Sequence, residues 1–222
     1  FGTGVGQRGA ADTGAGPVII ALGNSSGKLP GESDSGLIVD PTTSMRSQLS
    51  QHGFVIGPVK SKNGGRLTGS HGGTAQCIFD LHVAIQEAKT KFPDRPIWLA
   101  AYGSGTRIVA MALSGHFALP PRKDGTITML EIGSPPTSED GASASVIKKV
   151  SALFEEHPAL ARDAIIKDVS AAILMGFPLD HAKQDRSGAL QCLDSTVPVL
   201  VLSGAEDNLN KKGMLGAALA ES

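Results

Sequence analysis

The sequence predicts a doubly wound α/β fold with a mostly parallel sheet, and three observations support this class. From Pro17 onward, apolar runs of strand length alternate with segments of helical pattern. The strand-length runs are continuously apolar, which is typical of parallel strands that are buried on both faces. The connections between them are short, as expected for right-handed crossovers. A chain of 222 residues is long enough to form one such domain.

The first half of the chain contains the clearest elements. One helix is predicted from its caps, with Asp40 as N-cap, Pro41 at the first helical position and Gly53 just past the end. The other elements expected here are a strand at Val18–Leu22, a strand at Phe54–Val59, a helix from Thr74 to Phe92 with Ile78, Leu81, Ile85 and Ala88 on its apolar face, and a strand at Ile97–Ala101.

The second half alternates in the same way, with a less regular middle. The elements expected here are a helix over the TRIVAMAL segment ending near Gly115, a strand within Thr126–Ile132, a helical region over residues 143–168 that is interrupted at His157–Pro158, strands at Ala171–Phe177 and Val197–Ser203, and a last helix from about Asn210.

The predicted domain organisation is simple. Residues 1–16 are rich in glycine and poor in apolar side chains, so we expect a flexible N-terminal arm rather than a phosphate-binding loop, which would have to follow a strand. Residues 17–222 are predicted to form one α/β domain. Within it, residues 117–168 are predicted to be an insertion.

Composition and charge argue against several classes of protein. The net charge of −1 gives no indication of a nucleic-acid partner, and no apolar stretch approaches the roughly 20 residues of a membrane span. Two cysteines cannot build a disulfide framework, so an intracellular location is expected. No metal-ligand spacing or cofactor motif is present. Because Phe1 is not an initiator Met, a processed chain is expected, with a mitochondrial location as one option.

The most informative segment is Ile97–Arg107, where a buried strand leads through a turn of small residues into a helix. This is the setting of a nucleophile elbow, whose strained turn requires small residues two positions either side of the nucleophile. Centred on Gly103, the flanking residues are Ala101 and Gly105, which fit. Centred on Ser104, they are the bulky Tyr102 and Thr106. The better register therefore places a glycine where the nucleophile belongs.

The chain resembles the α/β-hydrolase superfamily, and within it the hydrolase-like branch of testis-expressed proteins and the KANSL subunit of an acetyltransferase complex. The resemblance covers about Val18 to Leu219. Its motifs are AAYGSGTRIVA at Ala100–Ala110, the segment Gly176–Gln184 with its Pro-Leu-x-His-x-Lys-Gln pattern, and PVLVLSGAEDNL at Pro198–Leu209. It implies an α/β-hydrolase-like sheet that lacks the last strand of the family, since the chain stops at Ser222.

The resemblance also implies an incomplete catalytic triad. The nucleophile position falls on Gly103 and the acid on Asp207, while no histidine follows His181 to serve as the base. The loop that supplies an oxyanion donor in the family corresponds here to the loop containing Gly23 and Asn24. Without nucleophile and base, the elbow would lose covalent catalysis.

Ser104 has two interpretations. It is either a displaced nucleophile, activated by a histidine in a non-homologous place, or a residue that only caps or lines the following helix. The histidines weighed as its base are His71, His82, His116 and His181.

The remaining reactive side chains also have a functional and a structural interpretation. Asp207 is either a surviving acid or a helix cap, and Asp180–His181 is either an acid–base pair or a structural turn. Cys77 and Cys192 lie in apolar patterns and are expected to be buried, inert thiols.

These observations favour a catalytically inactive α/β-hydrolase-fold protein that acts as a structural or interaction subunit, with protein partners in a larger assembly. The alternative is a serine hydrolase acting on esters or peptides, with Ser104, or a serine replaced at position 103, as its nucleophile. A third option is a binder of small molecules near Gly103.

Overall fold

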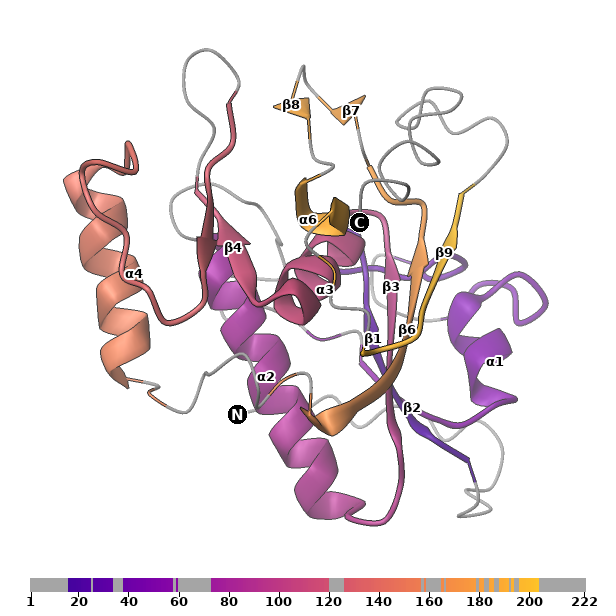
Figure 1. Cartoon of the computed structure of the whole chain (residues 1–222). Coiled ribbons are helices and arrows are strands. Elements are labelled where there is room, and N and C mark those ends of the chain that lie inside the picture. The colour runs from indigo at the N-terminus through magenta and orange to yellow at the C-terminus, as the bar shows by residue number, and fades with distance from the viewer. Residues whose placement is uncertain are drawn as a thin grey trace.

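The computed structural model describes residues 16–24, 26–33, 38–57, 59, 73–119, 126–156, 158, 165, 167–178, 180–181, 184–185, 188–191, 193 and 196–203. A central sheet is flanked by helices on both faces (Figure 1). Its five strands are all parallel and have the spatial order β2-β1-β3-β6-β9. They are β1 (Val18–Leu22), β2 (Phe54–Ile56), β3 (Ile97–Tyr102), β6 (Val169–Met175) and β9 (Val199–Leu202).

The helices and two small antiparallel hairpins complete the described part of the chain. One hairpin, β4–β5, and helix α4 lie within the segment predicted to be an insertion. The elements are α1 (Met45–Ser50), α2 (Gly73–Lys91), α3 (Ser104–Ser114), β4 (His116–Ala118), β5 (Met129–Glu131), α4 (Ala144–Glu156), β7 (Asp180–His181), β8 (Gln184–Asp185) and α6 (Gly188–Gln191).

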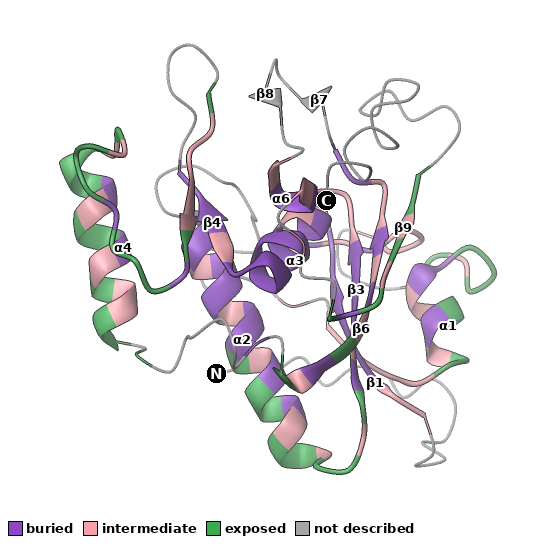
Figure 2. Ribbon diagram, viewed as in Figure 1, coloured by how far each residue is buried: buried purple, intermediate pink, exposed green. Residues whose placement is uncertain are grey.

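Two apolar clusters cover the two faces of the sheet, because successive side chains of a strand point to opposite faces. On one face, Leu22, Leu99 and Ala101 pack with the apolar faces of α2 and α3. On the other, Ile19 and Ala100 belong to a smaller cluster that includes buried residues of α1. Figure 2 shows that burial is concentrated in β1, β3 and α3. The doubly wound class predicted from the sequence is therefore confirmed.

Several individual predictions are confirmed as well. The strand Val18–Leu22 has its predicted bounds, and the four residues expected on the apolar face of α2 are all buried. The helix after β3 ends at Gly115, which adopts the left-handed conformation at φ 71°. Other strands are shorter or shifted: the strand predicted at Phe54–Val59 ends at Ile56, and β6 begins at Val169 rather than Ala171.

The prediction that Asp40 and Pro41 begin a helix is wrong. Helix α1 begins at Met45, and its N-cap is Ser44, whose hydroxyl accepts the backbone N–H of Ser47 at 3.4 Å. Asp40 instead accepts hydrogen bonds from the backbone N–H and hydroxyl of Thr42 at 2.8 and 2.7 Å. A carboxylate at such a position stabilises a turn as readily as a helix start, because both expose backbone N–H groups.

The end of α1 also differs from the prediction. Its C-cap is Gln51 rather than a residue next to Gly53. Gly53 is needed for another reason, since a Cβ there would collide with the carbonyl oxygen of Pro17. The glycine therefore allows close approach of β2 to the start of β1. Residues 1–15 of the arm predicted at residues 1–16, and the last predicted helix from about Asn210, lie outside the described residues.

Candidate functional site

The strand order places a topological switch point between β1 and β3. From β1 the chain moves outward to β2, then returns to pair β3 with the other side of β1. In open α/β sheets, ligands bind beyond the carboxyl ends of the strands at such a point. The carboxyl ends of β1 and β3 lead into two turns, which contain Gly23–Asn24 and Gly103–Ser104. We call Gly23, Asn24, Gly103, Ser104 and Gly105 the elbow site.

The turn after β3 has the backbone of a strained strand-to-helix connection. Gly103 adopts φ 57° and ψ −123°, a conformation that side-chain-bearing residues rarely take. Its N–H donates to the carbonyl of Met175 at 3.0 Å, which extends the β3–β6 pairing into the turn. The hydroxyl and N–H of Thr106 both donate to the Gly103 carbonyl, at 2.5 and 3.1 Å. The turn is therefore held from both sides.

The glycines of the site differ in how much room they leave. A Cβ at Gly105 would lie 2.6 Å from the carbonyl oxygen of Gly23, and a Cβ at Gly23 would lie 2.5 Å from the backbone nitrogen of Lys28. Among the described residues, a Cβ at Gly103 would meet Asn24 alone, at 3.4 Å from its Cβ, which is an ordinary contact. The backbones around position 103 thus pack too closely for side chains, whereas position 103 itself has space for one.

Asn24 closes the turn after β1. Its Oδ1 accepts the backbone N–H groups of Ser26 at 2.9 Å and of Lys28 at 3.2 Å. The backbone N–H of Asn24 donates to the Lys28 carbonyl at 2.9 Å, and its own carbonyl accepts the N–H of Gly27 at 2.8 Å. The side chain is half-buried and lies against the space beside Gly103.

Ser104 is the first residue of α3. Its Oγ is buried and has no hydrogen-bond partner among the residues that the structure describes. A nucleophile must be reachable by substrate and lie within hydrogen-bond distance of a base, and neither condition holds for this Oγ in the described part of the chain. Its backbone N–H, by contrast, belongs to the first turn of the helix, where N–H groups lack intrahelical acceptors.

Two of the four histidines considered as a base for Ser104 have described side chains, and neither makes a hydrogen bond with its hydroxyl. His82 is buried within α2. His116 follows the far end of α3, about 16 Å from Ser104 along the helix axis, and its Nδ1 lies 2.6 Å from the carbonyl oxygen of Ser114. His71 lies outside the described residues, and for His181 only the backbone, in β7, is described.

Other predicted residues are placed only in part. Cys77 is buried, as predicted, and forms no disulfide within the described residues. Asp207 and Cys192 lie outside the described residues, and Asp180 is described only as backbone of β7. The roles predicted for Gly103, Ser104 and Asp207 from the resemblance therefore stay predictions.

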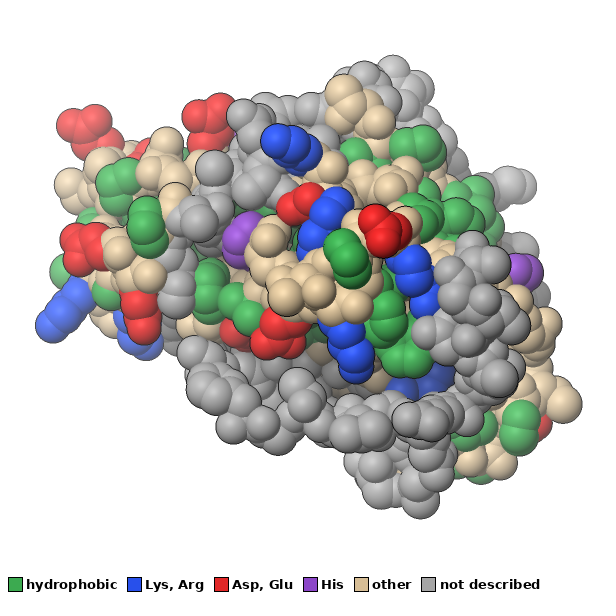
Figure 3. Space-filling model, turned by 90° about the horizontal axis from the view of Figure 1, so that it is seen from below, with side chains coloured by type: hydrophobic (Ala, Val, Ile, Leu, Met, Phe, Trp, Pro, Cys, Tyr) green, Lys and Arg blue, Asp and Glu red, His purple; other side chains and the backbone are tan. Residues whose placement is uncertain are grey.

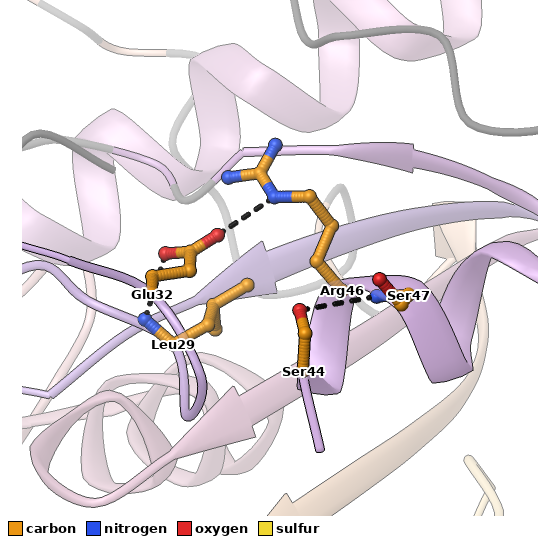
Figure 4. Close-up of polar contacts among 5 residues, drawn as sticks. All are labelled: Leu29, Glu32, Ser44, Arg46 and Ser47. Atoms are coloured by element: carbon orange, nitrogen blue, oxygen red, sulfur yellow. Dashed lines mark hydrogen bonds and ion pairs between the residues drawn. The ribbon is translucent and has the colours of Figure 1, made fainter. Parts of the chain in front are cut away.

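A buried ion pair near the elbow site was not predicted. The Arg46 guanidinium of α1 donates from Nε to Glu32 Oε1 at 2.7 Å, and the second carboxylate oxygen accepts the N–H of Leu29 at 3.0 Å (Figure 4). The Glu32 side chain is 0% exposed and that of Arg46 15%. This pair ties the segment after β1 to the first helix.

The described residues do not include a group of three or more histidine, cysteine or acidic side chains placed to hold a metal ion. Within the same part of the chain, no helix is both long and apolar enough to cross a membrane. On the face seen from below, acidic and basic side chains are interspersed (Figure 3). An ion pair joins Lys89 of α2 to Asp168 at 3.2 Å.

Two features of the site escaped sequence reasoning. The hydrogen bonds of Asn24 were not anticipated, although an asparagine followed by Ser-Ser-Gly directly after a strand is a recognisable turn pattern. The burial of the Ser104 hydroxyl was not anticipated either. Burial of a small side chain in a turn depends on how closely the neighbouring loop packs, which local sequence does not encode.

No protein-family model and no curated protein matches the sequence. Several solved structures resemble its fold. An acetylxylan esterase is 17% identical, covering 86% of this chain and 83% of that chain, with a TM-score of 0.39. An iodinated complex of acetylxylan esterase is 16% identical, covering 93% and 97%, with a TM-score of 0.41. Lysin B from a mycobacteriophage is 10% identical, covering 87% and 66%, with a TM-score of 0.42.

The fold assignment itself comes from the chain's own features. These are the parallel strand order, helices on both faces, and the turn at Gly103 that joins β3 to α3. The narrower resemblance to the testis-expressed and KANSL branch stays a prediction. The chain has a doubly wound α/β fold with a five-stranded parallel sheet among its described residues, and the assignment to the α/β-hydrolase superfamily stays a prediction.

Proposed function

We propose that this chain acts by binding rather than by bond cleavage, as an α/β-hydrolase-fold protein without covalent catalysis at its elbow. One observation carries the proposal. The turn after β3 holds residue 103 at φ 57° and ψ −123°, the place where a nucleophile would stand, and the residue there is a glycine. A glycine supplies no hydroxyl or thiol, while it adopts positive φ without the steric cost that other residues bear.

In this proposal the chain is a structural or interaction subunit with protein partners. A row of apolar side chains on the α1 face supports this part. Tyr102, Met175 and Leu202 are neighbours in register on β3, β6 and β9. Leu202 is 46% exposed and Leu200, on the same face of β9, is 53% exposed. Large apolar side chains that remain exposed on an edge strand are typical of surfaces that bind partners.

The test of the catalytic part is labelling of the full chain with a fluorophosphonate probe, together with hydrolysis assays on short acyl esters. We expect wild-type protein and the Ser104→Ala variant to label equally weakly, because residue 103 has no nucleophile. Stoichiometric labelling of Ser104, abolished in Ser104→Ala, would contradict the proposal. The test of the interaction part is the sedimentation of the native protein, which should move as part of a larger assembly.

The second candidate is an ester hydrolase that uses Ser104. The specific observation in its favour is that the Ser104 Oγ has no hydrogen-bond partner although it is buried beside the elbow. A hydroxyl left unbonded in a protein interior is costly, and such groups are found where function requires them. This candidate requires the side chain to rotate into reach of a substrate and a base, and the labelling experiment decides between the two.

A further inference from the structure

Strand β9 forms one edge of the described sheet, with β6 as its neighbour on one side (Figure 1). The backbone of Pro198 and Leu202 faces β6, since their carbonyls accept N–H groups of that strand at 2.9 and 2.8 Å. In a parallel pair, alternate residues turn both of their backbone groups toward the same side. The N–H and C=O groups of Val199 and Val201 therefore face away from β6, toward a side where the described part of the chain has no strand.

The side chains at this edge are apolar and exposed on the α1 face of the sheet. Leu200 is 53% exposed and Leu202 46%, and both lie in register with residues of β6. The sequence from Ser195 to Ala205 contains no charged residue, and β9 itself contains neither a proline nor a bulge. Natural proteins protect exposed edge strands with such features, because an unprotected edge pairs with other strands. The β9 edge is therefore suited to pairing.

The pattern of β9 fits a second copy of the same strand. Residues 199–201 read Val-Leu-Val, which is the same in both directions. Two copies related by a two-fold axis at Leu200 pair antiparallel, with Val199 of each copy opposite Val201 of the other. Each of these pairs exchanges two backbone hydrogen bonds, so the outward-facing groups of all four valines are used. A two-fold axis brings identical surfaces together, and here those surfaces carry no charge that would repel its own kind.

We propose that this chain forms a homodimer through β9, in which two five-stranded sheets join edge to edge about a two-fold axis at Leu200. The Leu200 side chains of the two copies then stand directly opposite each other, at a pair without backbone hydrogen bonds, where cross-strand side chains lie closest. This inference rests on the proposed function, because it names the partner of an interaction subunit. The contact is short, so we expect a weak dimer with a dissociation constant in the micromolar range.

The first experiment is sedimentation velocity of the purified full chain over a concentration series that spans the micromolar range. We expect a monomer–dimer equilibrium in the wild type. Leu200→Lys places two ammonium groups opposite each other and should weaken the dimer about tenfold or more. Val83→Lys, on α2 at the other face of the sheet, is the matched control and should dimerise as the wild type does. Both replaced side chains are exposed, so thermal unfolding of the monomers should change little.

The second experiment tests the register by cross-linking under mild oxidation with copper phenanthroline. In Leu200→Cys the two new thiols stand directly opposite, with Cβ atoms about 4.5–5.5 Å apart, and should form a disulfide between the copies. In Leu202→Cys, an equally exposed position of the same strand, the two thiols are displaced by four residues, about 13 Å, and cannot be bridged. Non-reducing electrophoresis measures both. The wild type controls for cross-links through Cys77 and Cys192.

Each other outcome overturns the inference. A dimer that Leu200→Lys does not weaken would use another surface, and equal cross-linking of the two cysteine variants would exclude the two-fold axis at Leu200. A purified chain that stays monomeric while the native protein sediments in a larger assembly would show that a different protein covers β9. In that case this inference fails and the proposed function stands. Native protein that also sediments as a monomer would contradict the interaction part of the proposed function as well, and fluorophosphonate labelling tests its catalytic part independently.

Discussion

The two turns that meet at the switch point are held together by different forces. The segment after β1 is fixed by side-chain hydrogen bonds, from Asn24 to its own loop and from Glu32 to Arg46 and Leu29. The turn after β3 is fixed by the hydrogen bonds of Gly103 and by backbone packing, since Gly105 lies against the carbonyl of Gly23 with no room for a Cβ. The first turn therefore depends on particular polar groups, and the second on the absence of side chains.

The fold retains the backbone of an elbow but has no side chain at position 103. Gly23 and Gly105 leave no room for a Cβ, yet among the described residues position 103 itself has space for a side chain. The strained backbone of an elbow is thus maintained without the side chain that would make use of it. Maintenance of such a backbone is consistent with a site that binds, because binding needs the positions of backbone donors and not a nucleophile.

A methyl group added at each glycine of the turn after β3 tests whether backbone packing distinguishes these positions, and it has the largest expected effect. Gly105→Ala should destabilise the fold by roughly 3 kcal/mol or more, because its Cβ meets backbone atoms that cannot move aside. Gly103→Ala should cost only about 1–2 kcal/mol, which is the strain of positive φ alone. Urea unfolding measures both. Equal losses for the two variants would show that packing does not distinguish these positions.

The contribution of the ion pair between Glu32 and Arg46 is tested by Glu32→Gln. This change keeps one acceptor oxygen but leaves the guanidinium of Arg46, 15% exposed, without its counter-charge. We expect a loss of about 2 kcal/mol, below the usual cost of breaking a fully buried pair because solvent reaches part of Arg46. Urea unfolding is again the measurement. The matched control is Asp40→Asn, an exposed carboxylate whose replacement should change stability far less.

The sequence predicted the architecture well because buried parallel strands and amphipathic helices leave periodic patterns. β1 and the apolar face of α2 could be identified from apolar residues alone. The helix start could not be predicted where two nearby residues were both suitable N-caps. Asp40 and Ser44 are both good N-caps, and only the packing of Met45 and Leu49 against the sheet selects Ser44.

Prediction of the site was limited for a related reason. The register of small residues identified the turn at Gly103, but the partners of Asn24 and Glu32 depend on how one loop folds back on itself and on α1. Such contacts join residues whose spacing follows no period. Sequence patterns therefore located the elbow without its surroundings.

A third prediction concerns the Ser104 hydroxyl, which has no hydrogen-bond partner among the described residues. Ser104→Ala removes a buried hydroxyl that has no partner, so the free energy of unfolding should rise by about 1 kcal/mol. If Ser104 instead made a hydrogen bond in solution, the variant would be less stable than the wild type. Thermal unfolding distinguishes the two signs, and Ser143→Ala is a suitable control because the Ser143 hydroxyl accepts the N–H of Val146 at 3.4 Å.

The smallest expected effect concerns the pKa of the Asp40 carboxyl. The Thr42 hydroxyl is the largest cause that lowers the pKa of this carboxyl below its usual value, followed by the Thr42 backbone N–H. Since the pKa is lower in the folded than in the unfolded chain, the stabilising contribution is present above about pH 4 and is lost as pH falls through the folded pKa. An NMR titration of the Asp40 carboxyl carbon measures this directly. In Thr42→Val, which removes the hydroxyl but keeps the N–H, the pKa should move part of the way back. An Asp40 pKa that is equal in folded and urea-unfolded protein would mean that the hydrogen bonds from Thr42 to Asp40 do not persist in solution.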